Sequence, residues 1–226
     1  MNSYERLSIV IGNDNIEKLK SKKVLLIGLG GVGGSCFETL IRSGIENIIV
    51  CDFDKFEETN LNRQILSNLN NINELKTDVA FNYAKNINPN SNIIKINKKL
   101  DVNSVHELPL DIDYIIDACD DIKVKIELVK FAINNNIKII SSMGVGNKID
   151  PLKLTITNIW KTNNDPIAKK MRNLLRKENI NYKLKVVSSS EVPVVKNNII
   201  GSYAPVCNIA GILLANYIIN DIISWK

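Results

Sequence analysis

Val24-Leu-Leu-Ile-Gly28-Leu-Gly30-Gly31-Val-Gly33 is the stretch that decides the fold of this 226-residue chain. Its apolar beginning is typical of a buried strand, its glycines predict a tight turn, and a helix pattern follows. Such a turn brings backbone N–H groups and a helix N-terminus close to a phosphate, with no side chain in the way. We therefore expect a bound nucleotide here. A strand-to-helix turn that binds nothing is the alternative.

Strand and helix patterns alternate on either side of this turn. The strands are predicted at 23–28, 46–52, 92–97, 112–118 and 137–142, and the helices at 13–20, 32–43, 73–87 and 121–135. Alternation of this kind predicts an α/β fold, Rossmann-like and doubly wound, with a mostly parallel sheet and helices on both faces.

The pattern changes after residue 144. A short strand is predicted at 153–157, a helix from Asp165-Pro166 to Lys177, strands and loops over 183–203, and a last helix over 206–223. We expect one domain over 1–226, in which 1–145 form the nucleotide-binding core. Residues 146–226 form an antiparallel C-terminal extension. Asparagines and an aspartate interrupt the apolar last helix, which favours a buried or dimer-forming helix over a membrane span.

Charge and cysteine usage limit the possible functions. The net charge is +5, and residues 161–185 alone hold eight basic and two acidic residues, a local net charge of +6. Such a surface predicts a polyanionic partner, first of all nucleic acid, although a solvated helix face is the alternative. The four cysteines are far apart and the chain has one histidine. This composition suits the cytoplasm and argues against a disulfide framework, a zinc site or a histidine-based triad.

The glycine turn also fits the dinucleotide fingerprint. Gly28-x-Gly30-x-x-Gly33 has the required spacing, and Asp52 closes the second predicted strand, where an acid would bind a ribose diol. On these residues alone, an NAD-dependent oxidoreductase is a valid hypothesis.

Polar residues further along the chain favour a site that splits ATP. Arg63 and Lys76 could neutralise the triphosphate and the departing pyrophosphate, and Asn60 could bind phosphate or the attacking group. Asp120 follows the fourth predicted strand and could hold Mg²⁺. A dehydrogenase has no need of this set.

The combined pattern resembles the ubiquitin-activating superfamily of adenylating enzymes, which includes the sulfur-carrier activators of thiamine and molybdopterin synthesis. The matching residues are Gly28, Gly30, Gly31, Gly33, Asp52, Asp54, Asn60, Arg63, Gln64, Lys76 and Asp120. The resemblance implies that these residues bind ATP, with Arg63, Lys76 and Asp120 in catalysis and Asp120 on the metal. Tyr4-Glu-Arg6 resembles an element whose arginine reaches into the partner's ATP site, which implies a homodimer with Arg6 acting in trans.

The last third resembles the subfamily that cyclises threonylcarbamoyladenosine in tRNA. Three segments carry this resemblance: Gly144 to Pro151, Asp165 to Arg172, and Gly201 to Gly211. It implies that ATP adenylates the threonine carboxylate, and that ring closure then releases AMP. The implied partner is tRNA, held by the basic helix through Lys169, Lys170, Arg172, Arg176 and Lys177. A monovalent cation and a sulfur-relay-type protein partner stay open, and Cys207 receives no role.

Three alternatives share some of these features. An activator of a ubiquitin-like sulfur carrier would use the same adenylation site, but such enzymes usually carry two C-x-x-C zinc pairs, which this chain lacks. An NAD-dependent oxidoreductase would leave Arg63 and Lys76 without a clear role. A nucleotide-sensing or RNA-binding module would bind ATP without producing AMP.

Overall fold

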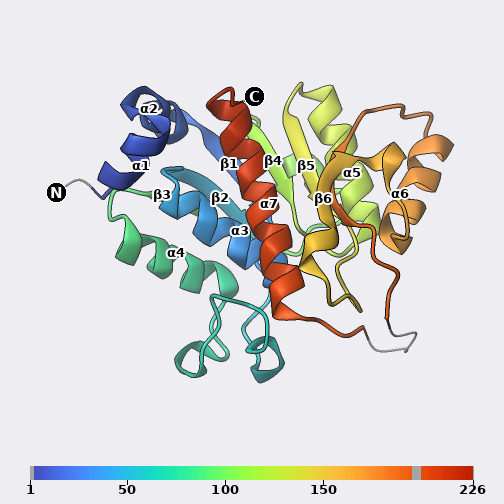
Figure 1. Ribbon diagram of the computed structural model, residues 1–226, viewed down its shortest axis with the longest axis horizontal. Coiled ribbons are helices and arrows are strands. Elements are labelled where there is room, and N and C mark those ends of the chain that lie inside the picture. The colour runs from blue at the N-terminus through green and yellow to red at the C-terminus, as the bar shows by residue number, and fades with distance from the viewer. Residues whose placement is uncertain (1–2, 195–199, 226) are drawn as a thin grey trace.

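A sheet of seven strands runs through the middle of the computed structural model, which describes residues 3–194 and 200–225 (Figure 1). The strand order is β3-β2-β1-β4-β5-β7-β6. The strands are β1 (Lys23–Ile27), β2 (Asn47–Cys51), β3 (Asn92–Ile96), β4 (Tyr114–Asp117), β5 (Lys138–Ser142), β6 (Leu154–Asn158) and β7 (Lys185–Ser189). The α-helices are α1 (Glu5–Ile11), α2 (Asn13–Ser21), α3 (Gly31–Arg42), α4 (Lys76–Ile87), α5 (Ile122–Asn134), α6 (Pro166–Lys177) and α7 (Ala204–Ile222).

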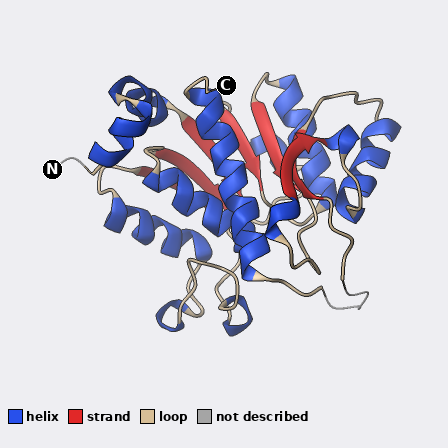
Figure 2. Cartoon of the chain, viewed as in Figure 1, coloured by secondary structure: helices blue, strands red, loops and turns tan. Residues whose placement is uncertain are grey.

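Helices cover both faces of the sheet (Figure 2). Along β1, Val24 and Leu26 join the core under α3, α4 and α7, whereas Leu25 and Ile27 join the core under α5 and α6. This alternation is the two-residue period of a strand buried on both faces. The predicted α/β class and doubly wound parallel sheet are confirmed.

Residues after 144 continue the same sheet. β7 pairs with β5 in parallel, and β6 pairs with β7 in antiparallel fashion at the edge. The predicted antiparallel extension is therefore this one strand pair. α6 begins where predicted, with Asp165 accepting a hydrogen bond from the backbone N–H of Ala168 and Pro166 in the first turn.

The last helix, α7, lies across α3 and against one face of the sheet (Figure 1). Among the described residues it is the one helix long and apolar enough to span a membrane, but 44% of that window is buried inside the protein. Core helices of soluble proteins meet the same criterion. This packing agrees with the predicted buried or dimer-forming helix.

Helix α1 is the element that the sequence pattern missed. None of its residues is buried, and Ile9 and Val10 are exposed. A helix without a buried stripe has no apolar period to detect. Gly12, with φ 81°, separates it from α2.

Candidate active site

One cavity of about 930 Å³ lies beyond the carboxyl ends of the parallel strands. β1 pairs with both β2 and β4, so the strand order reverses direction beside β1. Open α/β sheets bind ligands in the crevice at such a switch point. The loops after β1, β2 and β4 line this cavity, as do the turns that hold Asn60, Arg63 and Gln64.

The glycine turn lines the cavity. Gly28 has φ 90°, and a Cβ on Gly33 would lie 1.9 Å from the carbonyl oxygen of Gly28, so neither position accepts a side chain. Gly30 and Gly31 line the cavity at the first turn of α3. The unpaired N–H groups of that turn favour an anion.

Asp52 is buried beside this turn, at the end of β2. One carboxylate oxygen accepts from the N–H of Leu29 at 2.6 Å, and the other accepts from the N–H of Asp54 at 2.8 Å. Burial raises the pKa of the Asp52 carboxyl, and these two N–H groups oppose the shift. The carboxylate keeps lone pairs that could accept from a ribose diol.

Two cations face the cavity from different elements. Lys76, the first residue of α4, is buried, with its ammonium 3.2 Å from the Asp54 carboxylate. The Arg63 guanidinium donates to the Thr59 carbonyl at 2.8 Å and to the Asn62 side chain at 2.9 Å. Both side chains therefore have fixed positions before any phosphate is bound.

Asn60 and Gln64 complete this side of the cavity. The Asn60 side chain closes a capping box with Glu57 in a short 3₁₀ helix, Glu58–Asn60. The Gln64 side chain is buried, and its carbonyl oxygen has no hydrogen-bond partner among the described residues. A buried acceptor without a partner is unusual, and this oxygen is itself closed to solvent.

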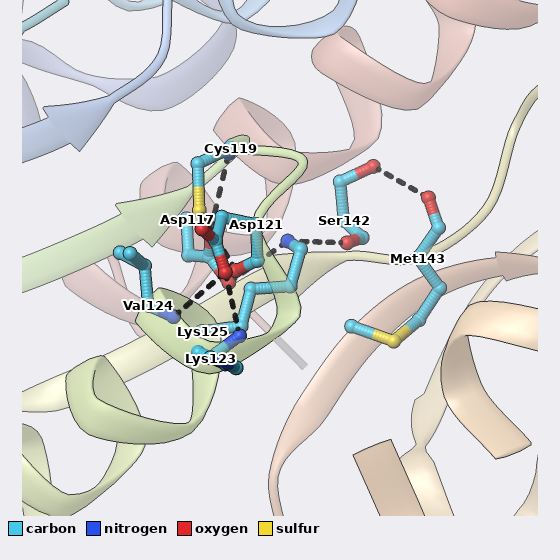
Figure 3. A network of polar contacts seen from close by, with 8 residues as sticks. All are labelled: Asp117, Cys119, Asp121, Lys123, Val124, Lys125, Ser142 and Met143. Atoms are coloured by element: carbon cyan, nitrogen blue, oxygen red, sulfur yellow. Dashed lines mark hydrogen bonds and ion pairs between the residues drawn. The ribbon is translucent and has the colours of Figure 1, made fainter. Parts of the chain in front are cut away.

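The loop between Asp117 and Asp121, which carries Asp120, is fixed at both ends, and Figure 3 shows the hydrogen bonds that fix it. Asp117, at the end of β4, accepts from the buried Lys125 ammonium at 3.0 Å, and Lys125 also donates to the Ser142 carbonyl at 2.9 Å. Asp121 caps α5 by accepting from the N–H groups of Lys123 and Val124. The Asp120 side chain, between these anchors, is exposed to the cavity.

The surroundings of the Asp120 carboxylate suit a Mg²⁺ ion that the nucleotide also binds. They do not suit a Mg²⁺ ion bound by protein ligands alone. Within residues 3–194 and 200–225, no three His, Cys, Asp or Glu side chains form a metal cluster. Mg²⁺ usually takes one or two carboxylates together with substrate phosphates and water, so one free carboxylate in a phosphate cavity is sufficient.

Other predicted site residues lie outside the cavity. Arg6 is exposed on α1 and does not line it. On α6, Lys169, Lys170, Arg176 and Lys177 are exposed, and the Arg176 guanidinium lies 5.3 Å from the Trp160 ring. Arg172 differs from the expectation, because its guanidinium turns inward to the carbonyls of Ile159 and Thr162. Arg172 therefore links α6 to the turn that precedes it.

Several cavity residues were not predicted from the sequence. Lys98, Lys99 and the buried Lys148 also line the cavity and add positive charge. Isolated lysines carry no signal in one sequence. Cys207 also lines the cavity, and burial raises the pKa of its thiol although Arg63 opposes the shift.

Comparisons with known proteins agree with this geometry. The sequence pattern of the ThiF family matches residues 4–225. The tRNA threonylcarbamoyladenosine dehydratase of Bacillus subtilis is 39% identical over 86% of this chain and 77% of that protein. Dehydratase 2 of Saccharomyces cerevisiae is 37% identical, over 81% of this chain but 42% of that protein.

A solved structure shares the whole fold. The crystal structure of the Escherichia coli tRNA N6-threonylcarbamoyladenosine dehydratase in complex with ATP superposes with a TM-score of 0.93 at 25% identity, and the match covers 98% of this chain and 94% of that one. The glycine turn, the sheet order and the sequence matches all lead to the same conclusion: this chain belongs to the ThiF family, among the relatives named tRNA threonylcarbamoyladenosine dehydratases.

Proposed function

We propose that this chain is an ATP-dependent dehydratase that acts on tRNA carrying N6-threonylcarbamoyladenosine. The observation that carries the proposal is the shared cavity, in which Arg63, Lys76 and Asp120 come together beside the glycine turn. These side chains come from three separate segments, and an ATP-splitting reaction gives all of them a role.

The reaction needs activation because a carboxylate is a poor acyl donor. A threonine carboxylate oxygen attacks the α-phosphorus of ATP, and the bond from that phosphorus to pyrophosphate breaks. A nitrogen or oxygen of the same side chain then attacks the acyl carbon, and the carbon–oxygen bond to AMP breaks. The attacking group loses its proton to solvent, and the net change is the loss of one water, driven by ATP.

Electrostatic stabilisation is the main task of the protein in this scheme. Arg63 and Lys76 neutralise charge that develops on the pyrophosphate, and the first turn of α3 holds the phosphates through its N–H groups. Ring closure is intramolecular, so a fixed substrate geometry can supply about 7–11 kcal/mol of the barrier reduction. Asp52 anchors the ribose through the lone pairs that its two N–H partners leave free.

A magnesium ion bound with the nucleotide would take Asp120 as its protein ligand. It would add positive charge at the phosphates, which stabilises the departing pyrophosphate. A monovalent cation remains a further proposal with no residue assigned to it.

The exposed lysines and Arg176 of α6 are the proposed tRNA-binding surface. They lie on one helix at the end of the sheet formed by the extension, and phosphate contacts by such side chains give sequence-independent affinity. Arg172 holds α6 in place by donating to the carbonyls of Ile159 and Thr162.

The proposal includes a homodimer in which Arg6 enters the partner's cavity. Its support is the exposure of Arg6 and of the neighbouring Ile9 and Val10, which gives α1 an unpaired apolar patch. A cytoplasmic location and a sulfur-relay-type protein partner are also proposals, the first supported by four free cysteines.

An activator of a ubiquitin-like sulfur carrier is the second candidate, because it would share the adenylation site. The basic helix and the lack of C-x-x-C pairs weigh against it. One experiment separates the candidates: incubate the protein with ATP plus threonylcarbamoyladenosine-modified tRNA, a carrier protein, or neither, and measure AMP. AMP formed only with the modified tRNA supports the proposal, and AMP formed only with a carrier overturns it.

A further inference from the structure

Lys148 lines the same cavity, together with residues that have no part in the proposed nucleotide site. We call this group of residues the second arm of the cavity: 142–148, Pro166, Ile167, Pro193, Ile200 and Ser202. The whole cavity has a volume of about 930 Å³, near the upper end of the roughly 300–1,000 Å³ that ligand pockets span.

The second arm has fixed walls. The N–H of Asn147 donates to the Gly201 carbonyl at 2.9 Å, and the Asn147 carbonyl accepts from the Val194 N–H at 2.8 Å. The Asn62 side chain donates to the Ser202 carbonyl at 3.3 Å, which joins this wall to the loop that carries Arg63. Residue 148 is therefore held at a defined place facing the cavity.

The Lys148 ammonium is poorly paired for a buried cation. Its side chain is 2% exposed, and its one hydrogen bond among the described residues goes to the Ser189 carbonyl at 3.1 Å. An ammonium has more donors than this acceptor uses. Burial lowers the pKa of Lys148, and Asp165 and Glu191 oppose the shift without forming an ion pair with it.

The two carboxylates near Lys148, those of Glu191 and Asp165, accept their hydrogen bonds from uncharged groups. Glu191, which follows β7, accepts from the N–H groups of Ile149 and Asp150 at 3.0–3.2 Å. Asp165, the cap of α6, accepts from the Gly144 N–H, the Ala168 N–H and the Ser188 hydroxyl. Asp150, on the loop of Lys148 itself, caps the next turn. Neither carboxylate therefore pairs with Lys148, and its remaining donors have no protein acceptor among the described residues.

We infer that Lys148 is a substrate-positioning residue that binds the carboxylate of the tRNA side chain before adenylation. The assignment rests on the proposed function and names the part of the substrate that the second arm receives: a short side chain with a terminal carboxylate. Apolar walls from Pro166, Ile167 and Pro193 pack against the aliphatic part, and the ammonium pairs with the charged end. The nucleotide phosphate is the other anion in the cavity, so the test must separate the two.

The test compares Lys148→Met, Lys148→Gln and Lys148→Arg with the wild type. Each is assayed for AMP formation on modified tRNA and for binding of a non-hydrolysable ATP analogue. Lys153→Met is the matched control, because Lys153 is a half-exposed lysine on the same segment and does not line the cavity. Analogue binding and thermal unfolding report whether each variant is folded.

Loss of a charge-assisted hydrogen bond to substrate predicts that kcat/KM for modified tRNA falls by at least about tenfold in the Met and Gln variants. Affinity for the ATP analogue and the Lys153→Met activity stay within about twofold of the wild type. The Arg variant, which keeps the charge, retains more activity than the Gln variant. A Gln variant with wild-type kcat/KM overturns the assignment, since it would mean that only the bond to Ser189 matters.

The pH dependence of kcat/KM for tRNA distinguishes substrate binding by Lys148 from a purely structural role. As the pH rises through the lowered pKa, the ammonium loses its proton and the substrate carboxylate loses its partner. Wild-type kcat/KM for tRNA therefore falls at a pH below the ordinary lysine value of about 10.4, and the Arg variant lacks this limb. Identical profiles overturn the assignment, as does a defect in ATP-analogue binding alone. A wild type that forms no AMP on modified tRNA instead overturns the proposed function.

Discussion

The Lys125 ammonium lies 3.0 Å from the Asp117 carboxylate, and both side chains are almost completely buried. Lys125 also donates to the Ser142 carbonyl, so one side chain joins the end of β4, the first turn of α5 and the end of β5. Burial is the largest single influence and would lower the pKa of Lys125, but the charge and hydrogen bond of Asp117, with Cys119 and Asp120, together raise it. Lys125 therefore keeps its charge, and its contacts fix the loop that carries Asp120.

Breaking this pair is expected to destabilise the whole domain. Lys125→Met leaves the Asp117 charge buried without its partner, which costs about 3–5 kcal/mol in free energy of unfolding. Lys123→Met, on the exposed face of the same turn, should change it by less than about 0.5 kcal/mol. Urea unfolding monitored by circular dichroism checks both values. Equal stability of the two variants would mean that the pair contributes little.

Two adjacent glycines of α3 offer a matched test of the phosphate turn. A Cβ on Gly33 would lie 1.9 Å from the Gly28 carbonyl oxygen, whereas the nearest atom to a Cβ on Gly34 is 3.6 Å away. Gly33→Ala must displace the turn, so we expect loss of ATP binding measured by calorimetry. Gly34→Ala should bind ATP normally and gain up to about 1 kcal/mol of stability, because alanine favours a helix. ATP binding by both variants would contradict the role of the turn.

The phosphate turn was predictable because its chemistry is local. Gly28 and Gly33 are close in sequence, and their spacing alone predicts the strand, the turn and the helix. The apolar strands were predicted for the same reason, since burial on both faces requires continuous apolar runs such as those of β1 and β2. The doubly wound order then followed from the alternation of elements.

Features that depend on long-range contacts were not predictable. Arg172 has the same charge as its neighbours on α6, and only the fold shows that its guanidinium turns toward Ile159 and Thr162. Lys148 and Lys125 are ordinary lysines in the sequence. Their burial depends on strands β7 and β5, which contribute the carbonyls of Ser189 and Ser142.

Substitutions at Asp120 and Asp121 distinguish the proposed metal ligand, Asp120, from the cap of α5, Asp121. Asp120→Asn should lower ATP-to-pyrophosphate exchange by about a hundredfold or more, and raise the Mg²⁺ concentration needed for half-maximal rate, because a charged ligand is lost. Asp121→Asn keeps a side-chain oxygen for the cap of α5, so its exchange rate should match that of the wild type. An unchanged Mg²⁺ requirement in Asp120→Asn would remove Asp120 from the metal.

The basic surface of α6 should be visible in the salt dependence of tRNA binding. Reversing Lys169 and Lys170 to glutamate removes phosphate contacts, so affinity falls and the plot of log affinity against log salt becomes shallower. Reversal of Lys18 and Lys20 on α2, at the other side of the sheet, changes the net charge equally and serves as the control. Filter binding at several salt concentrations measures both. If both double variants lose the same affinity and the slope of log affinity against log salt does not change, the basic side chains of α6 are only solvated and do not bind tRNA.

Arg6 can be tested in mixed dimers, because its exposure on α1 leaves it outside the cavity of its own chain. In the proposed homodimer, Arg6→Ala and Lys76→Ala should each abolish most AMP formation, the first because the arginine in trans is lost and the second because the lysine at the phosphates is lost. A mixed dimer contains one cavity with Lys76 intact and Arg6 supplied by the other subunit. Mixed dimers are obtained by co-expression with two affinity tags. Each should have about half of the activity of a wild-type dimer. Mixing Arg6→Ala subunits with Arg6→Ala,Lys76→Ala subunits is the control that no dimer arrangement can rescue. If the first mixture stays as inactive as this control, Arg6 does not act across the interface.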